Sequence, residues 1–69
     1  MSFDVDGEKL RQLRVKKALS LRALGEITGV AFDTISKLEN GHRPARLVTI
    51  RTLADVLGVE PKALMKGDG

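Results

Sequence analysis

The sequence predicts an all-α domain, a compact bundle of five short helices. Apolar residues recur at helical spacing, glycine or proline separates the periodic segments, and no stretch alternates apolar with polar residues over the length of a strand. The 69 residues suffice for one domain, so we expect a single unit over 1–69 with an ordered core at about 7–65. Because so short a chain buries only about 60% of its unfolded surface, its core has to be tightly packed.

The first two helices are predicted at residues 8–18 and 21–28. Asp6 and Ser20 precede them as N-caps, since a short side chain with an oxygen accepts a hydrogen bond from an amide of the first turn. Gly29 ends the second helix because glycine adopts the left-handed conformation without penalty.

The third helix is predicted at residues 32–40, and Gly41 ends it in the same way. A loop is expected at 42–45, where Pro44 prevents continuation of the helix.

The fourth helix is predicted at 46–57 and is closed by Gly58. Its apolar residues follow one face at positions i, i+3, i+6, i+7 and i+10, namely Leu47, Ile50, Leu53, Ala54 and Leu57. A last helix is expected from about residue 60 to 65, with Pro61 at the first helical position, and the tail 66–69 is expected to fray.

Residues 20–41 meet the requirements of two short helices joined by a tight turn. A very small residue is needed where the second helix crosses the first, and Gly25 supplies it. The turn needs a residue that tolerates positive φ, which is Gly29. The crossing angle is then fixed by the apolar residues Leu24, Val30, Ile35 and Leu38. Together these features predict a helix-turn-helix.

From about residue 7 to 65 the chain resembles the lambda-repressor-like, or Xre/Cro-type, helix-turn-helix family. The resemblance rests on L-R-Q-L-R in the first helix, L-G-E-I-T-G-V across the turn, T-I-S-K-L-E-N-G in the third helix and L-A-D-V-L-G-V at the end of the fourth. It implies a sequence-specific DNA-binding transcriptional regulator, a repressor that acts as a homodimer. The third helix would enter the major groove, and two copies would bind a palindromic operator with half-sites about 34 Å apart.

The resemblance also assigns DNA contacts position by position. Base contacts would come from Phe32, Asp33, Thr34 and Lys37, where Lys37 can donate to guanine and Phe32 can pack on a thymine methyl group. An acid in the first turn also stabilises a helix, so Asp33 has a structural alternative. Phosphate contacts would come from Ser20, Arg22, Asn40, Gly41, Arg43 and Arg46.

Two further assignments concern structure and assembly. The resemblance implies an ion pair between Arg14 and Glu39 that links the first helix to the end of the third. Val59, Leu64 and Met65 either belong to the core or leave an apolar patch for a partner related by twofold symmetry.

Composition excludes several classes of protein. Lys and Arg number 12 against 9 acids, a net charge of +3 that is compatible with a polyanionic partner. Cysteine is absent and His42 has no companion ligand, so we expect no disulfide, metal or cofactor. The chain lacks a phosphate-binding glycine loop and an evident pair of catalytic carboxylates, so it is not expected to be an enzyme. With no apolar run long enough to span a membrane, we expect a cytoplasmic protein without membrane association.

One alternative keeps the fold and changes the partner. Leu21, Phe32 and Asp33 lie where the resemblance expects DNA, and they would also suit a protein surface. An antitoxin or adapter that binds a protein partner such as a toxin is therefore a second hypothesis, and such a protein could also bind DNA.

Overall fold

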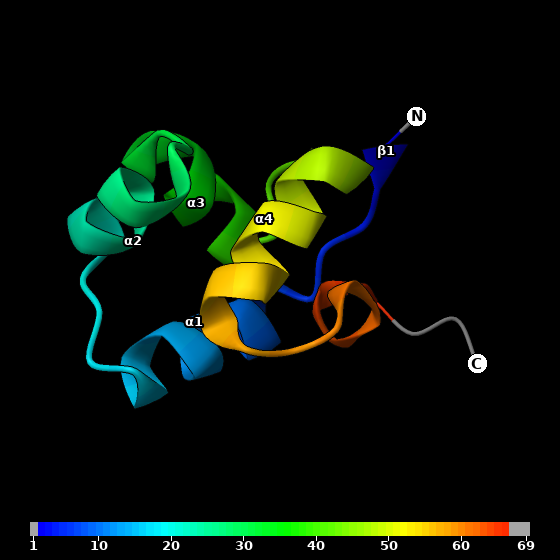
Figure 1. The fold of residues 1–69 in the computed structure, drawn as a ribbon. Coiled ribbons are helices and arrows are strands. Elements are labelled where there is room, and N and C mark those ends of the chain that lie inside the picture. Colours follow the sequence, from blue (N-terminus) through cyan, green and yellow to red (C-terminus); the bar gives the residue numbers. More distant parts are fainter. Residues whose placement is uncertain (1, 67–69) are drawn as a thin grey trace.

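Figure 1 shows the chain as a computed structural model that describes residues 2–66. Within this range the α-helices are α1 (Gly7–Lys16), α2 (Leu21–Thr28), α3 (Phe32–Glu39) and α4 (Leu47–Leu57), followed by a 3₁₀ helix, η1 (Pro61–Leu64). Two short strands, β1 (Ser2–Phe3) and β2 (Ala45–Arg46), complete the elements. Most of the tail predicted to fray, residues 67–69, lies outside the described residues.

The prediction of five α-helices is wrong in its last member, because residues 2–66 form four α-helices and the 3₁₀ helix. In η1 the amide of Ala63 donates to the carbonyl of Glu60, three residues back, at 2.9 Å. Met65 then turns to extended backbone and forms an antiparallel bridge with Val5. With only four residues before this bridge, the segment closes the tighter 3₁₀ turn instead of an α-helix.

The prediction that the chain contains no strand is also wrong. β1 and β2 pair antiparallel, with Ser2 opposite Arg46 and Phe3 opposite Ala45. Each strand has two residues, which is too short for an alternating pattern to show in the sequence. The pairing fastens the N-terminal segment to the backbone that leads into α4.

α4 crosses the middle of the molecule, between the α2–α3 pair and η1 (Figure 1). The largest fully buried side chains come from α1, α2, α3, α4 and η1, and they are Leu10, Leu24, Ile35, Leu38, Ile50, Leu53 and Leu64. Leu64 is therefore a core residue, the first of the two alternatives given for it, and it is not accessible to a partner. Val59 and Met65 are half-buried against the same core.

The predicted N-caps are present. The carboxylate of Asp6 accepts a hydrogen bond from the amide of Lys9 at 3.1 Å, and the hydroxyl of Ser20 accepts one from the amide of Ala23 at 3.0 Å. α1 ends two residues earlier than predicted, because Ala18 adopts a positive φ of 57° and the chain turns toward α2. Within the described part of the chain, the helices are too short and too polar to cross a membrane.

Candidate nucleic-acid interface

The turn between α2 and α3 is held by close backbone approach and by one hydroxyl. A methyl group on Gly25 would lie 2.8 Å from the carbonyl oxygen of Val30, so a side chain there would push the two segments apart. Gly29 has a φ of 78°, as the turn requires. The hydroxyl of Thr28 donates to the carbonyl of Leu24 at 2.7 Å and accepts from the amide of Val30 at 3.2 Å. This role of Thr28 was not predicted, although a hydroxyl residue directly before the turn glycine was a signal for it.

α3 buries one side and presents the other. Ile35 and Leu38 are completely buried, so the residues on the opposite side point outward. Thr34 and Ser36 are half-buried on this outward side. The exposed residues of the same side are Phe32, Asp33, Lys37 and Asn40. Ser36 was not among the predicted contacts, although its position four residues after Phe32 was a signal for it.

Basic side chains flank the edge of α3 that carries Thr34. Arg43 and Arg46 are exposed and line one groove with Thr34 and Ser2. Arg46 is also the N-cap of α4 and makes no side-chain capping hydrogen bond, so the positive end of that helix is open beside two guanidinium groups. An anion such as a phosphate is stabilised by this combination. The β1–β2 pair positions the loop, because Ser2 lies opposite Arg46.

The end of α3 uses two of the predicted phosphate ligands for its own structure. The side-chain amide of Asn40 donates to the carbonyl of Ser36 at 2.8 Å. Gly41 has a φ of 71°, and its amide donates to the carbonyl of Leu38 at 3.2 Å. Both residues therefore end the helix, and the exposed Arg43 follows two residues after Gly41.

Arg14 and Glu39 form an ion pair between α1 and the end of α3. Nε of Arg14 donates to Oε2 of Glu39 at 2.6 Å, and Nη2 donates to Oε1 at 3.1 Å. The third nitrogen, Nη1, donates to the carbonyl of Leu19 at 2.8 Å, so the guanidinium also holds the segment that leads into α2. The hydrogen bond that Arg14 donates to Glu39, with a smaller contribution from the charge of Glu39, raises the pKa of Arg14 above its ordinary value, against the opposing effect of burial. The pair therefore anchors α3.

Two short helices hinged at glycine, with the second exposed between basic flanks, define a helix-turn-helix domain. The chain belongs to the helix-turn-helix domain family, which matches residues 7–66. Among residues 2–66, no cluster of three or more His, Cys, Asp or Glu is placed to hold a metal ion.

Relatives and solved structures agree with this assignment. The chain is 41% identical over 64 residues to the uncharacterized HTH-type transcriptional regulator RghRB of Bacillus subtilis, a match that covers 91% of this chain and 46% of the relative. The chain spans less than half the length of the curated relatives that it matches. Its fold is similar to the restriction-modification controller protein C.AhdI of Aeromonas hydrophila, with a TM-score of 0.80, 37% identity and coverage of 86% of this chain and 89% of that one. It is also similar to the P22 c2 repressor solved with a synthetic operator, with a TM-score of 0.83, 32% identity and coverage of 90% and 94%.

Proposed function

We propose that this chain is a sequence-specific DNA-binding transcriptional regulator that represses by occupying an operator, with α3 in the major groove. The observation that carries the proposal is the outward side of α3, which lies between Arg22 at the start of α2 and Arg43 with Arg46 before α4. Phosphate contacts from such flanking residues set the position of a helix in the groove, and the helix itself reads bases. The likeness to a repressor solved with its operator supports this function.

Four outward residues of α3 have proposed roles. Lys37 donates to guanine, and Phe32 and Thr34 lie at the two edges of the contact. Asp33 faces outward in the first turn of α3, where Ala31 provides no side-chain cap. Its carboxylate therefore stabilises the positive end of this helix, and we assign that role ahead of a base contact.

Selection of bound duplexes from random DNA tests the function directly. We expect two related half-sites about 34 Å apart, as a dimeric helix-turn-helix protein requires. A chain that enriches no sequence at low salt would contradict the proposal.

Replacement of the basic flanks should change the salt dependence of binding. We expect Arg43→Ala and Arg46→Ala each to reduce the slope of log affinity against log salt by about 0.9, because each variant loses one phosphate contact. Lys37→Ala should instead relax base preference at one position, at a cost of about 1–3 kcal/mol. Mobility shifts on a selected duplex at several salt concentrations measure both effects. Lys62→Ala on η1 is the matched control, and an unchanged slope in both arginine variants would refute these assignments.

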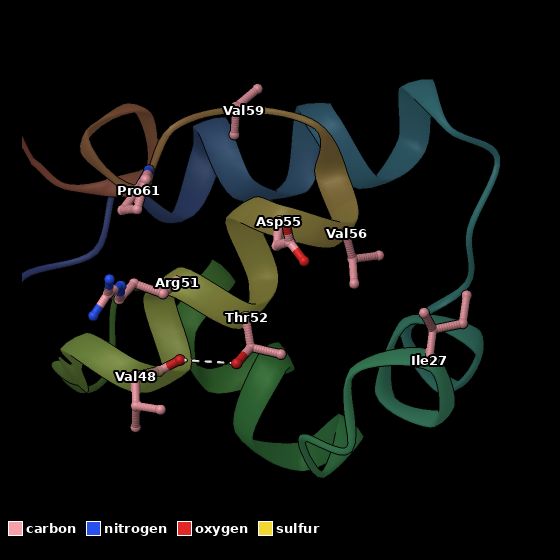
Figure 2. Close-up of a pocket in the computed structure, with 8 residues that line it drawn as sticks. All are labelled: Ile27, Val48, Arg51, Thr52, Asp55, Val56, Val59 and Pro61. Atoms are coloured by element: carbon pink, nitrogen blue, oxygen red, sulfur yellow. Dashed lines mark hydrogen bonds between the residues drawn. The ribbon is translucent and has the colours of Figure 1, made fainter.

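We propose further that a second copy of the chain covers a groove along α4 that is lined by both apolar and charged side chains. Figure 2 shows this groove, in which Val48 is 64% exposed and Ile27 of α2 is 56% exposed. Arg51 and Asp55 lie one turn apart in the same groove, on one helix. If two α4 helices pack antiparallel with the twofold axis midway between Arg51 and Asp55, each Arg51 faces Asp55 of the partner subunit, which is the self-complementary register that we propose. The groove is lined by Ile27, Val48, Arg51, Thr52, Asp55, Val56, Val59 and Pro61, so it leaves the outward side of α3 free for DNA.

Charge reversal tests this dimer. We expect Arg51→Asp and Asp55→Arg each to shift the chain toward monomer, because each places like charges opposite one another across the axis. The double variant Arg51→Asp/Asp55→Arg restores opposite charges and should recover the dimer. Sedimentation equilibrium at several concentrations measures the monomer–dimer equilibrium of the wild type and of the three variants. A wild-type chain that stays monomeric, or a double variant that dimerises no better than the singles, would refute the interface.

The protein-interaction hypothesis rests on the same face of α3. Phe32 is 44% exposed beside the acidic Asp33, which suits a protein partner such as a toxin. Leu21 no longer supports this hypothesis, because it packs partly buried against the core. Co-purification with a protein together with no DNA affinity at low salt would favour an antitoxin or adapter.

A further inference from the structure

One contact connects the first turns of α2 and α3. The guanidinium carbon of Arg22 lies 5.4 Å from the centroid of the Phe32 ring, over its face. Both side chains are exposed and line one groove at the glycine hinge. A cation within about 6 Å of an aromatic centroid is attracted by the negative face of the ring. The exposed ring of Phe32 is therefore in a specific contact with Arg22.

The close approach of α2 and α3 at Gly25 fixes the backbone from which the Phe32 ring extends. A methyl group on Gly25 would lie 3.3 Å from the amide nitrogen of Phe32, so the first residue of α3 sits tightly against α2. The Phe32 ring therefore starts from a fixed backbone position. Arg22 is the flexible member, because a long arginine side chain has many rotamers when nothing holds it.

Glu26 is an alternative partner for the guanidinium of Arg22, in competition with the Phe32 ring. It follows Arg22 by four residues on α2 and lines the same groove. Residues four apart on a helix are neighbours and can form an ion pair. An Arg22 released from the ring could turn toward Glu26, and its charge would then be neutralised instead of being offered to a phosphate.

We propose that Phe32 is a positioning residue, whose ring holds Arg22 so that the guanidinium donates to a DNA phosphate beside the start of α3. Stacking uses the planar face of the guanidinium and leaves its N–H groups free at the edge. A phosphate is the group that accepts from such an edge in two parallel hydrogen bonds. This role rests on the proposed DNA-binding function, and it differs from a contact between Phe32 and a thymine methyl group.

A double-mutant cycle on a selected duplex tests the inference. We expect Arg22→Ala to lower affinity about five- to tenfold at 0.1 M salt and to reduce the salt slope by about 0.9, since one phosphate contact is lost. Phe32→Leu keeps an apolar side chain and removes the aromatic face, and we expect a loss of about two- to fivefold, with a smaller slope. Phe32→Tyr keeps the aromatic face and should bind like the wild type. The double variant Arg22→Ala/Phe32→Leu should bind no more weakly than Arg22→Ala alone.

The competing outcomes are separable. Additive losses in the double variant, or an unchanged salt slope in Phe32→Leu, would overturn the positioning role. A selected duplex carrying deoxyuridine for thymine, if it reproduces the Phe32→Leu loss, would assign the ring to a methyl contact instead. Thermal melting of each variant checks the fold, which these exposed substitutions should leave intact. If the wild type binds no duplex at all, the DNA-binding function fails as well, whereas wild-type binding with additive losses overturns only the role of Phe32.

Discussion

The variant Glu39→Gln is expected to destabilise the domain by about 3–5 kcal/mol, because it leaves the charge of Arg14 in a nearly closed site without its partner. The side chains of Arg14 and Glu39 are only 13% and 7% exposed, so water replaces little of the lost interaction. At about 0.05–0.15 kcal/mol per residue, a domain of 69 residues has about 3–10 kcal/mol of stability, so this loss removes a large share of it. We expect the urea midpoint of the variant to lie far below that of the wild type, measured by unfolding followed by circular dichroism.

Two comparisons isolate the cause of that loss. Glu60→Gln makes the same chemical change at an exposed position and should alter stability by less than about 0.5 kcal/mol. Replacing both partners, as in Arg14→Met/Glu39→Leu, removes both charges and should cost less than Glu39→Gln alone. A Glu39→Gln variant that loses under about 1 kcal/mol would show that the pair behaves like a surface ion pair.

The variant Gly7→Ala is the second large effect that we expect, at about 3 kcal/mol. Gly7 is buried at the start of α1, and an added methyl group would collide with the backbone carbonyl oxygens of Leu38 and Glu39. Those carbonyls belong to the last turn of α3, so relief requires α1 and α3 to move apart. The melting temperature should fall by about 12–24 °C, since each kcal/mol shifts a domain of this length by about 4–8 °C.

Lys9→Ala is the control for this prediction, because it introduces alanine into the same helix at an exposed position. It should change stability by less than about 0.5 kcal/mol. If the Gly7→Ala variant has the same melting temperature as the Lys9→Ala variant, α1 and α3 can move apart at no cost. Their contact then does not fix the position of α3.

Both predictions concern how α3 is held. Gly7 allows the start of α1 to lie directly against the end of α3. Arg14 binds Glu39, the last residue of α3. The ion pair was predicted only through family resemblance, and the close approach at Gly7 was not predicted. Neither contact can be recognised from the periodicity of the sequence, since each joins residues more than 20 positions apart.

Local chemistry made much of the fold predictable. The N-caps at Asp6 and Ser20 and the turn at Gly29 depend on groups within a few residues of one another, so the sequence contains all the information that they need. Four helices follow from the spacing of apolar residues, because one helical face has to meet the core. The outward position of Lys37 follows from the same periodicity.

The contacts between segments far apart in the chain were decided only by the tertiary structure. The pairing of β1 with β2 and the burial of Leu64 depend on segments far apart in the chain. The position of Arg22 over Phe32 depends on how closely α2 and α3 meet at the hinge. The sequence alone determines which residues can form helices and turns, because those interactions span about one turn. Which side chains then meet across the bundle depends on distances and angles between whole elements, and these exist only once the elements have packed together.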